Sequence, residues 1–381
     1  MEIRLKKVNI KNGEQVGLWL TWHRDGNRSS EMNYGTGIST SWYENGQMEM
    51  QGKMLNGKRD SIWTFWWETG EKKFYGRFEK GIKQGVHTFW GKNGHKISEI
   101  EFKDGKKHGS AKWWLEDGKL DIEGNFVDGV QEGKWTYWRT DGKKGNEGEY
   151  KNGKMNGHWI YWYANGQVWK EGDYKDDRKE GHWIIYYENG QKFYEGDFLD
   201  GKEEGLWYSW YENGKEHMIG EFLHRQMNGR WEAWYENGVK EYEVSYINDL
   251  KNGVCKYWNE QGRNMLVESY KNGISHGQYT TYFADGTVNI NGYFVEGERN
   301  GRWTFYAEGG LKVREEIYKN GKKEGRWLSW HMNGKPETEI NYKNDMRHGR
   351  MKTFNKTGQL IYDANYKNDR VEKIFVNKLE N

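Results

Sequence analysis

The sequence predicts an all-β protein, an elongated repeat array of antiparallel β-hairpins stacked in a single twisted, curved sheet. Three observations support this prediction. Glycine recurs every 24 residues from Gly46 to Gly358, and such a period marks a repeated supersecondary element. Aromatic residues make up 17% of the 381 residues, and large rings favour strands. The only proline is Pro336, and sheet interiors exclude proline because it cannot donate to a ladder.

The first predicted strand of each repeat is rich in aromatic residues. We number positions within a repeat from 0, which falls at residue 37 and then every 24 residues up to 349. Position 0 is glycine in thirteen of the fourteen repeats and Ser61 in the other. Position 2 is tryptophan in eight repeats, and position 5 is aromatic in all fourteen. Positions 2 and 5 have opposite parity, so aromatic side chains line both faces of the sheet or a bulge rotates one set.

Two turns divide each repeat. Positions 8 and 9 read Asn-Gly or Asp-Gly in ten repeats, a pair typical of a tight, two-residue type I′ hairpin turn. Position 20 is glycine in nine repeats and aspartate in four, which predicts a second turn. The expected order is therefore strand, tight turn, strand, looser turn.

The second predicted strand combines aromatic residues with glycine. Position 17 is aromatic in thirteen repeats, with Met54 as the exception, and position 15 is glycine in eight. If the tight turn has two residues, position 2 lies opposite position 15. Trp63 would then cover Gly76, and Trp183 would cover Gly196, because a ring folded over a strand glycine can stabilise a sheet.

The ends of the chain depart from this pattern. Residues 1–36 are predicted to form an N-terminal cap and a shortened repeat, residues 37–372 fourteen 24-residue repeats, and residues 373–381 a C-terminal cap strand through Ile374 and Phe375. Atypical terminal units are expected because the ends of a repeat array need capping.

The repeats resemble MORN repeats, and more closely the variant found in bacterial antitoxin-like proteins. The matching motifs include Tyr150-Lys151-Asn152-Gly153 and Tyr161-Trp162-Tyr163-Ala164-Asn165-Gly166, with Tyr270-Lys271-Asn272-Gly273 as a further copy. The resemblance covers nearly the whole chain. It implies hairpins stacked into a groove-bearing sheet that binds proteins, and lipid binding has also been proposed for the family.

Composition and charge narrow the range of partners. The 59 Lys and Arg residues nearly balance the 57 Asp and Glu residues, and the two signs alternate along the chain. Nucleic-acid and anionic-lipid surfaces need clustered basic charge. We therefore expect no nucleic-acid partner and, at a membrane, no more than weak peripheral contact.

The sequence also predicts a cytoplasmic protein. No apolar run reaches the 18 residues of a transmembrane segment, and the N-terminus lacks the apolar stretch of a signal peptide. The single cysteine, Cys255, allows no intrachain disulfide.

No motif indicates catalysis. His158 and His182 share a position in neighbouring repeats, but such neighbours lie roughly 10 Å apart across two strands, too far for one zinc ion. Cys255 stands where other repeats have tryptophan, and we interpret it as a small buried residue. Glutamates recur at position 14 between lysines, which indicates cross-strand ion pairs. They include Glu123, Glu147, Glu171 and Glu195. We expect no enzymatic activity, no cofactor and no metal site.

The predicted function is that of a binding scaffold for a protein or peptide partner. Tryptophan and tyrosine are enriched at binding hot spots, and their even repetition suits distributed contact. The candidate contact residues are the position-5 side chains in the middle of the array. They are Trp138, Trp162, Tyr186, Trp210, Trp234 and Trp258. Two alternatives are carbohydrate or cell-wall binding through aromatic ladders, and antitoxin-like neutralisation of a toxin protein.

Overall fold

The computed structural model describes residues 4–378, in which strands joined by turns are the only regular elements. The chain divides into an N-terminal unit, residues 1–190, and a C-terminal unit, residues 191–381. Residues 1–3 of the predicted N-terminal cap and 379–381 of the predicted C-terminal cap lie outside the described residues.

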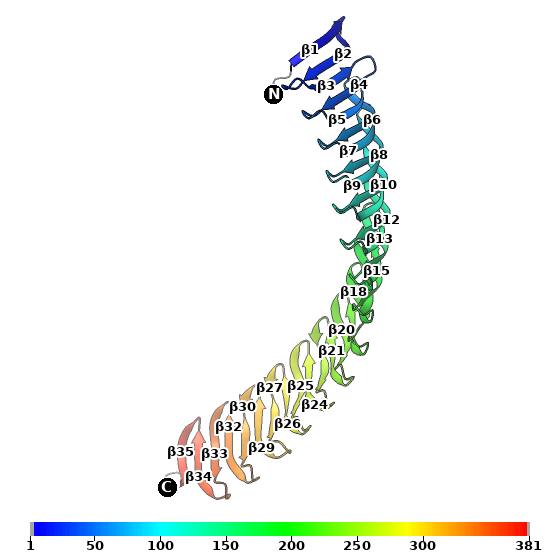
Figure 1. The fold of residues 1–381 in the computed structure, drawn as a ribbon. Coiled ribbons are helices and arrows are strands. Elements are labelled where there is room, and N and C mark those ends of the chain that lie inside the picture. Colours follow the sequence, from blue (N-terminus) through cyan, green and yellow to red (C-terminus); the bar gives the residue numbers. More distant parts are fainter. Residues whose placement is uncertain (1–3, 379–381) are drawn as a thin grey trace. The chain divides into compact units, whose positions relative to one another are not determined.

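The N-terminal unit contains sixteen strands (Figure 1). They are β1 (Arg4–Lys11), β2 (Glu14–Trp22), β3 (Arg28–Asn33), β4 (Ile38–Trp42), β5 (Met48–Leu55), β6 (Lys58–Trp66), β7 (Lys72–Glu79), β8 (Ile82–Trp90), β9 (Lys96–Lys103), β10 (Lys106–Trp114), β11 (Leu120–Val127), β12 (Val130–Trp138), β13 (Lys144–Lys151), β14 (Lys154–Trp162), β15 (Val168–Lys175) and β16 (Arg178–Tyr186).

The C-terminal unit continues the pattern. Its strands are β17 (Lys192–Leu199), β18 (Lys202–Trp210), β19 (Glu216–Leu223), β20 (Gln226–Trp234), β21 (Lys240–Ile247), β22 (Leu250–Lys251), β23 (Gly253–Trp258), β24 (Asn264–Lys271), β25 (Ile274–Tyr282), β26 (Val288–Val295), β27 (Glu298–Arg299), β28 (Gly301–Tyr306), β29 (Lys312–Lys319), β30 (Lys322–Lys323), β31 (Gly325–Trp330), β32 (Pro336–Lys343), β33 (Met346–Phe354), β34 (Leu360–Lys367) and β35 (Arg370–Asn377).

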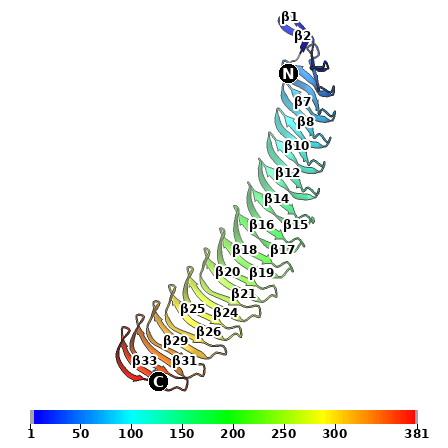
Figure 2. The same ribbon diagram turned by 60° about the vertical axis from the view of Figure 1, so that its left-hand side comes forward.

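Within each unit, the strands form an antiparallel sheet in chain order. In the N-terminal unit, for example, β12 pairs with β11 and β13, and β14 pairs with β13 and β15. Three strands of the C-terminal unit are interrupted by one residue, at Asn252, Asn300 and Glu324. Figure 2 shows the hairpins side by side with bowed strands. The predicted all-β repeat fold is therefore confirmed.

The two turns of a repeat have the reverse of their predicted types. The turn at positions 19 and 20 is the tight one, because Asn152 and Gly153 have φ angles of 52° and 77°, and a type I′ turn requires two positive φ angles. At positions 8 and 9, Gly166 has a φ of 93°, whereas Asn165 has no positive φ. The Tyr163 N–H donates to the Gln167 carbonyl at 2.9 Å, and the Gly166 N–H donates to the Tyr163 carbonyl at 3.0 Å. These bonds close a three-residue loop with a glycine bulge.

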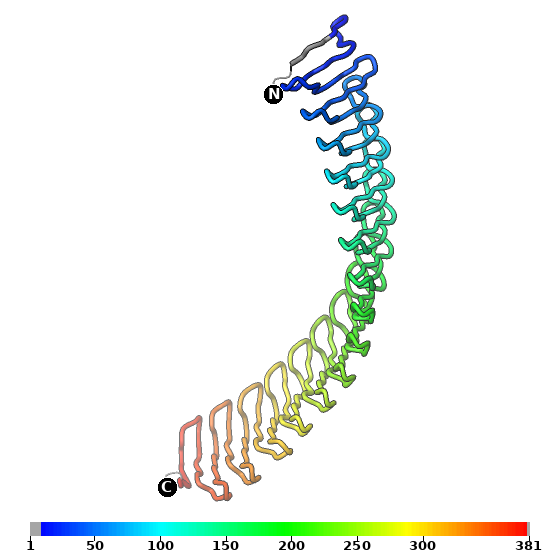
Figure 3. The backbone as a smooth tube through the Cα atoms, in the orientation of Figure 1, coloured from blue at the N-terminus to red at the C-terminus, as the bar shows by residue number. Residues whose placement is uncertain are grey.

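The physical reason for this difference is the asparagine side chain. The Asn165 Oδ1 accepts a hydrogen bond from the Gln167 N–H at 2.9 Å, so the side chain closes a local turn of its own. Figure 3 follows the backbone through these loops and through the tight turns between them.

The glycine at position 0 forms a second bulge. Glu147 pairs with Ile160, and Glu149 pairs with Asn156, so three residues of β14 stand opposite the single residue Gly148 of β13. Gly157, the first of the three, has a φ of 64°. This left-handed conformation favours glycine, which explains the recurrence of glycine at this position.

The strands place aromatic side chains on both faces of the sheet. Positions 2 and 4 share one face, where Trp159 stacks on Tyr161 at 6.2 Å between ring centroids. Positions 3 and 5 share the opposite face, where Tyr208 stacks on Trp210 at 6.1 Å. We call the face of positions 2, 4, 13, 15 and 17 the aromatic face, and the face of positions 1, 3, 5, 11 and 14 the polar face.

Each buried tryptophan of the aromatic face covers a glycine of the preceding repeat. A Cβ atom at Gly148 would lie 2.1 Å from the ring of Trp159, which is 2% exposed. The Trp159 indole N–H donates to the Glu149 carbonyl at 3.2 Å. Seven of the eight position-15 glycines lie under a tryptophan in this way, and the eighth, Gly76, lies under His87. We call each such pair a lid.

The prediction of which glycine lies under each ring was wrong by one strand. Trp63 is in register with Gly76, as predicted, but its ring lies over Gly52. Trp183 likewise covers Gly172, whereas Gly196 lies under Trp207. The rings lean towards the preceding strand because their indole N–H groups reach carbonyl oxygens there, as Trp63 does with Lys53 at 3.0 Å.

Two pairs with the same spacing as a lid combine a residue larger than glycine with one smaller than tryptophan. Ile100 replaces the glycine in one lid, and its partner Ala111 replaces the tryptophan. Val244 and Cys255, which have the same spacing in the chain, form a similar pair, and both are buried. The prediction that Cys255 is a small buried residue is thus confirmed, and burial raises the pKa of its thiol.

Candidate functional site

The aromatic face has no covering layer. Among residues 4–378, strands make their main contacts with strands adjacent in the chain, and no helix or second sheet lies on either face of a unit (Figures 1 and 2). Seven of the eight tryptophans at position 2 are buried, with Trp327 as the exception, but the rings at position 4 keep part of their surface in solvent. In the N-terminal unit these rings are Phe65, Phe89, Trp113, Tyr137 and Tyr161.

The rings of this face contact one another from repeat to repeat. Trp135 stacks on Trp113 at 6.2 Å and on Tyr137 at 6.2 Å, and meets Tyr150 edge-on at 5.8 Å. The Tyr137 and Tyr150 hydroxyls lie 3.3 Å apart. Burial, followed by this hydrogen bond, raises the pKa of Tyr150, so the hydroxyl stays neutral. Such contacts stabilise ring pairs beyond simple burial, and they form a continuous apolar surface.

The polar face carries the six residues that the sequence predicted as partner contacts. All six are partly buried. Trp138, Trp162 and Tyr186 lie in the N-terminal unit, and Trp210, Trp234 and Trp258 lie in the C-terminal unit. The structure thus places them on the face opposite the continuous aromatic surface.

Lysines at position 11 cover several of these rings. The Lys144 Nζ lies 5.7 Å from the centroid of Trp162, and the Lys192 Nζ lies 5.5 Å from that of Trp210. The Lys240 Nζ lies between Trp234 and Trp258, at 5.7 and 6.0 Å. Cations at such distances from ring faces make favourable contacts.

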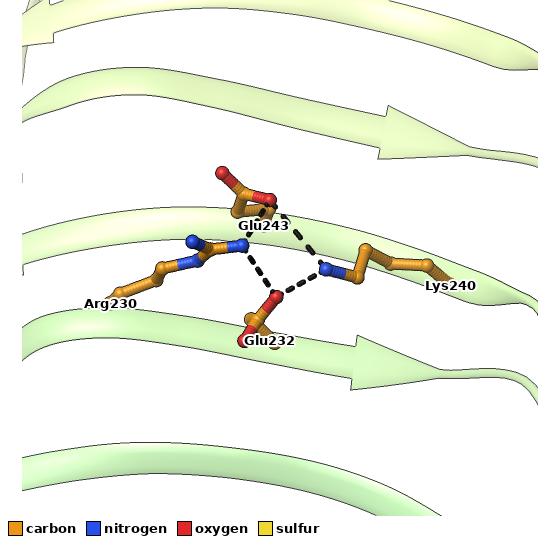
Figure 4. Close-up of polar contacts among 4 residues, drawn as sticks. All are labelled: Arg230, Glu232, Lys240 and Glu243. Atoms are coloured by element: carbon orange, nitrogen blue, oxygen red, sulfur yellow. Dashed lines mark hydrogen bonds and ion pairs between the residues drawn. The ribbon is translucent and has the colours of Figure 1, made fainter.

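Ion pairs join neighbouring strands across the polar face. Figure 4 shows one network, in which the Arg230 guanidinium contacts Glu232 at 2.8 Å and Glu243 at 2.7 Å. Lys240 contacts both carboxylates as well. Burial alone would raise the pKa of Glu232, but hydrogen bonds from Lys240 and Arg230 hold it below its usual value.

The interpretation of the position-14 glutamates as members of cross-strand ion pairs is confirmed for Glu123 and Glu147. Glu123 contacts Lys112 at 3.3 Å, and Glu147 contacts Lys134 at 3.2 Å. Glu147 also contacts Lys144 of its own strand at 2.7 Å. These pairs leave the polar face with few uncompensated charges.

A hollow of about 430 Å³ lies on the polar face around Trp138. Its lining combines that ring with charged side chains, including Lys112, Glu123, Lys134 and Glu147. A larger hollow of about 960 Å³ lies where the shortened repeat meets the first full one, and Met32, Met50, Met54 and Trp63 line it.

Two further side-chain series link successive loops, and the sequence prediction missed them. The Tyr163 hydroxyl at position 6 donates to the Tyr186 carbonyl at 2.8 Å. The Asn165 Nδ2 at position 8 donates to the Glu188 carbonyl at 2.8 Å. Tyr43 and Asn45 make the same bonds to Trp66 and Glu68. The signal was present in the sequence, because tyrosine at position 6 recurs with the same 24-residue period.

The described residues show no arrangement typical of a metal centre. Between residues 4 and 378, no group of three or more His, Cys, Asp or Glu side chains is placed to hold a metal ion. The described chain also has no helix of the length and apolar character that a membrane crossing requires.

Comparison with solved structures finds distant likenesses. One is titled "Crystal Structure of TcdB2-TccC3-TEV", with 11% identity over 95% of this chain and 22% of the other, at a TM-score of 0.17. Another is a Tc holotoxin pore of Photorhabdus luminescens, with 10% identity over 92% of this chain and 21% of the other, at a TM-score of 0.15. The chain spans about a fifth of the length of these chains. Scores this low carry no structural argument.

No curated protein matches the chain. A family model described as "MORN repeat variant" does match, in seven segments distributed along it. They are residues 36–56, 107–128, 155–176, 179–200, 227–248, 323–344 and 347–368. The hairpins, turns and lids described above recur in register with these segments. The chain is therefore a MORN-repeat protein.

Proposed function

We propose that this protein is a non-enzymatic scaffold that binds a protein partner along the aromatic face of its sheet. One observation carries the proposal: in the N-terminal unit, five successive repeats have a partly exposed ring at position 4, from Phe65 to Tyr161, and within the described residues no covering layer lies on them. A sheet normally buries its apolar face against another element, and large exposed apolar patches mark interaction sites. A partner would supply the missing layer.

The repeat also supports a distributed mode of binding. Five successive repeats of the N-terminal unit offer a ring at position 4, from Phe65 to Tyr161, so a long partner would meet similar contacts in succession. Several weak contacts on one rigid partner act together with a high effective concentration. The membership in the MORN-repeat family is consistent with a role in protein interaction.

The polar face is a second candidate surface because of the hollow around Trp138. The six predicted contact residues lie on this face and remain candidates for partner contact. Against this face stands its charge compensation, since Lys134 and Lys144 are already paired with Glu147. A partner would have to displace or share these ion pairs.

Neighbouring residues on opposite faces allow the two surfaces to be compared. Full-length protein with Tyr137→Ala tests the aromatic face, and Trp138→Ala tests the polar face. Circular dichroism first shows that each variant melts as the unaltered protein does. Each variant and the unaltered protein are then used to capture partners from the native host, and the captured proteins are measured by quantitative mass spectrometry. If Tyr137→Ala alone reduces recovery of a specific protein, the aromatic face is the binding surface.

The opposite results would contradict the proposal in different ways. Loss of the partner with Trp138→Ala alone would move the binding site to the polar face. Absence of any protein enriched by the unaltered chain would remove the scaffold role itself. Carbohydrate binding, toxin neutralisation, cytoplasmic location and the lack of enzymatic activity remain predictions, and no contact in the structure favours the first two.

A further inference from the structure

We propose that the aromatic face of the N-terminal unit binds an acidic segment of a partner protein. This inference rests on the proposed function and specifies the chemistry of the partner. It starts from a difference in charge between the two units. From residue 35 to residue 185, the aromatic-face positions and position −2, which borders them, contain no aspartate or glutamate. In the C-terminal unit the same positions include Glu203, Glu268 and Glu316.

Cations lie among the rings of the N-terminal unit's aromatic face. At position −2, the Arg59 guanidinium lies 5.0 Å from the centroid of Trp63, the Lys83 Nζ 4.7 Å from that of Phe102, and the Lys107 Nζ 4.8 Å from that of Phe126. The Nζ of Lys170, at position 13, lies 4.4 Å from the centroid of the Tyr161 ring. We call these four residues the cation row.

No carboxylate neutralises the cation row. Among residues 4–378, no Asp or Glu oxygen lies within ion-pair distance of any of its four members. Two of the four cations at position −2 of the C-terminal unit differ, since Arg299 contacts Glu316 at 3.7 Å and Arg347 contacts Asp369 at 2.9 Å. Arg59, Lys83 and Lys107 thus lack the counter-charges that Arg299 and Arg347 have at the same repeat position.

A partner that covers this face has to place negative charge opposite the cation row. Burying a charge without an opposite charge is unfavourable, and complementary charges set partner choice and speed association. Lys170 is partly buried before any partner binds, and this burial lowers its pKa. The matching surface therefore combines apolar side chains with carboxylates.

Single-stranded nucleic acid also combines negative charge with flat rings, but the face suits it poorly. Such partners stack their bases on exposed aromatic rings. Four of the five tryptophans of this face are at most 3% exposed and already act as lids. They are Trp63, Trp135, Trp159 and Trp183. A protein segment needs only apolar contact at the ring edges, so the geometry favours an acidic protein.

The spacing of the cation row suggests how the acidic residues are arranged. Arg59, Lys83 and Lys107 follow one another at one-repeat intervals, and two strands span roughly 9.5 Å. Seven residues of an α-helix rise about 10.5 Å. A helix lying across the strands would therefore present carboxylates at residues i, i+7 and i+14 to the three cations in turn.

The test uses synthetic peptides and the full-length protein. The probe is a fluorescein-labelled helical peptide with a leucine-rich face and glutamates at i, i+7 and i+14, and its twins carry glutamine or lysine at those places. Fluorescence anisotropy is recorded at low and high salt. We expect the glutamate peptide to bind at least about tenfold more tightly than the lysine peptide, with binding that weakens in salt.

Matched protein variants identify the cations responsible. Arg59→Gln, Lys83→Gln and Lys107→Gln are combined in one variant. The control combines Lys58→Gln, Lys106→Gln and Lys154→Gln, which remove the same charge from exposed residues at position −3. The first variant should lose about tenfold in affinity for the glutamate peptide, and the control should stay within about twofold because exposed charges are screened.

Each remaining outcome would overturn the inference. Equal binding of the three peptides, equal loss in both variants, or no binding of the glutamate peptide below about 100 µM would exclude an acidic partner at this face. The proposed function has a separate readout. If Tyr137→Ala still abolishes capture of a native partner while the cation-row variant captures it normally, the scaffold role stands and only the acidic chemistry is wrong.

Discussion

At the scale of single residues, the lid formed by Gly148 and Trp159 determines how closely two strands can pack. The indole ring occupies the space where any Cβ at residue 148 would lie. Gly148→Ala should therefore destabilise the protein by about 1–3 kcal/mol, the usual cost of overpacking. In a Trp159→Ala background the same change should be neutral or slightly stabilising, because alanine is preferred to glycine in a strand.

Urea unfolding of the two single variants and the double variant measures this coupling. We expect an interaction energy above about 1 kcal/mol, as found for residues in direct contact. If the effects of the two substitutions simply add, the ring does not act through the glycine.

His87 forms the one lid in which a titratable ring covers a glycine. It is fully buried, and its Nε2–H donates to the Arg77 carbonyl at 2.8 Å. Burial lowers the pKa of His87 below its usual 6.5, so the folded protein favours the neutral ring. The stability from this group is present above pH 6.5 and is lost as the pH falls through the folded-state pKa.

Replacing His87 should remove this part of the pH dependence. His87→Trp restores the side chain found in the other lids over glycine, and the free energy of unfolding of this variant should fall less between pH 7.5 and pH 5 than that of the unaltered protein. His95→Gln, a change at an exposed histidine that forms no lid, serves as control. Parallel profiles for the unaltered protein and His87→Trp would show that His87 does not titrate on unfolding.

The lids could have been found from the sequence, but comparison within a single repeat conceals them. Glycine and tryptophan at positions 15 and 2 coincide only by chance within one repeat. When each glycine is compared with the residue 11 places later, seven of eight are followed by tryptophan. Val244 and Cys255 have the same spacing of 11 residues. The small side chain of Cys255 leaves room for Val244, which stands where other repeats have glycine.

At the scale of elements, the turn and bulge glycines define the hairpin. Ser61 is the only residue other than glycine at position 0, and its φ is 60°. A side chain in this left-handed conformation costs roughly 1 kcal/mol. Ser61→Gly should therefore stabilise the protein by about that amount.

A neighbouring serine provides the control for this substitution. Ser110 lies at position 1 of its repeat, in the middle of β10, and has no positive φ, so Ser110→Gly should destabilise the protein by about 0.5–1 kcal/mol. Thermal melting of both variants compares them directly. Destabilisation by Ser61→Gly would show that the Ser61 hydroxyl, which donates to Asp60 at 3.1 Å, outweighs the backbone strain.

The strands were predictable from the sequence, whereas the turn types were not. Asn-Gly occurs in both turns of the repeat and favours a type I′ turn in each. The difference lies in two side-chain bonds of Asn165, one accepted from the Gln167 N–H within the loop and one donated to the Glu188 carbonyl of the next repeat. Contacts between repeats cannot be derived from a dipeptide propensity, because tertiary bonds override it.

At the scale of the whole chain, contacts run mainly between adjacent strands. In such arrays, stability is approximately the sum of repeat and interface terms. Deletion of residues 133–156, one complete repeat of the N-terminal unit, should therefore leave a folded protein, because Trp159 would then cover Gly124. Deletion of residues 145–156 removes half a repeat and should disrupt the fold, because the following strand would run in the wrong direction. Circular dichroism and unfolding curves distinguish the two outcomes.

The sequence predicted that aromatic residues form the binding surface, but it did not predict which face of the sheet binds. The position-5 rings were selected because all fourteen repeats carry one, yet the structure places them beside compensated charges. The cation row escaped notice because Arg59, Lys83 and Lys107 are separated by a full repeat and the overall charge is balanced. Only the register of the strands shows that no acid faces them.

The division of each lid between two repeats has a consequence for how such a gene can change in length. Unequal crossing-over within the stretch of glycine–tryptophan lids joins equivalent halves and leaves every new junction well packed. A crossover between the codons of Val244 and Cys255 instead joins a valine to an incoming tryptophan, and the valine side chain would occupy the space that the ring takes in the glycine–tryptophan lids. The number of repeats can therefore change readily within that stretch. The two repeats that share Val244 and Cys255 should instead be gained or lost together.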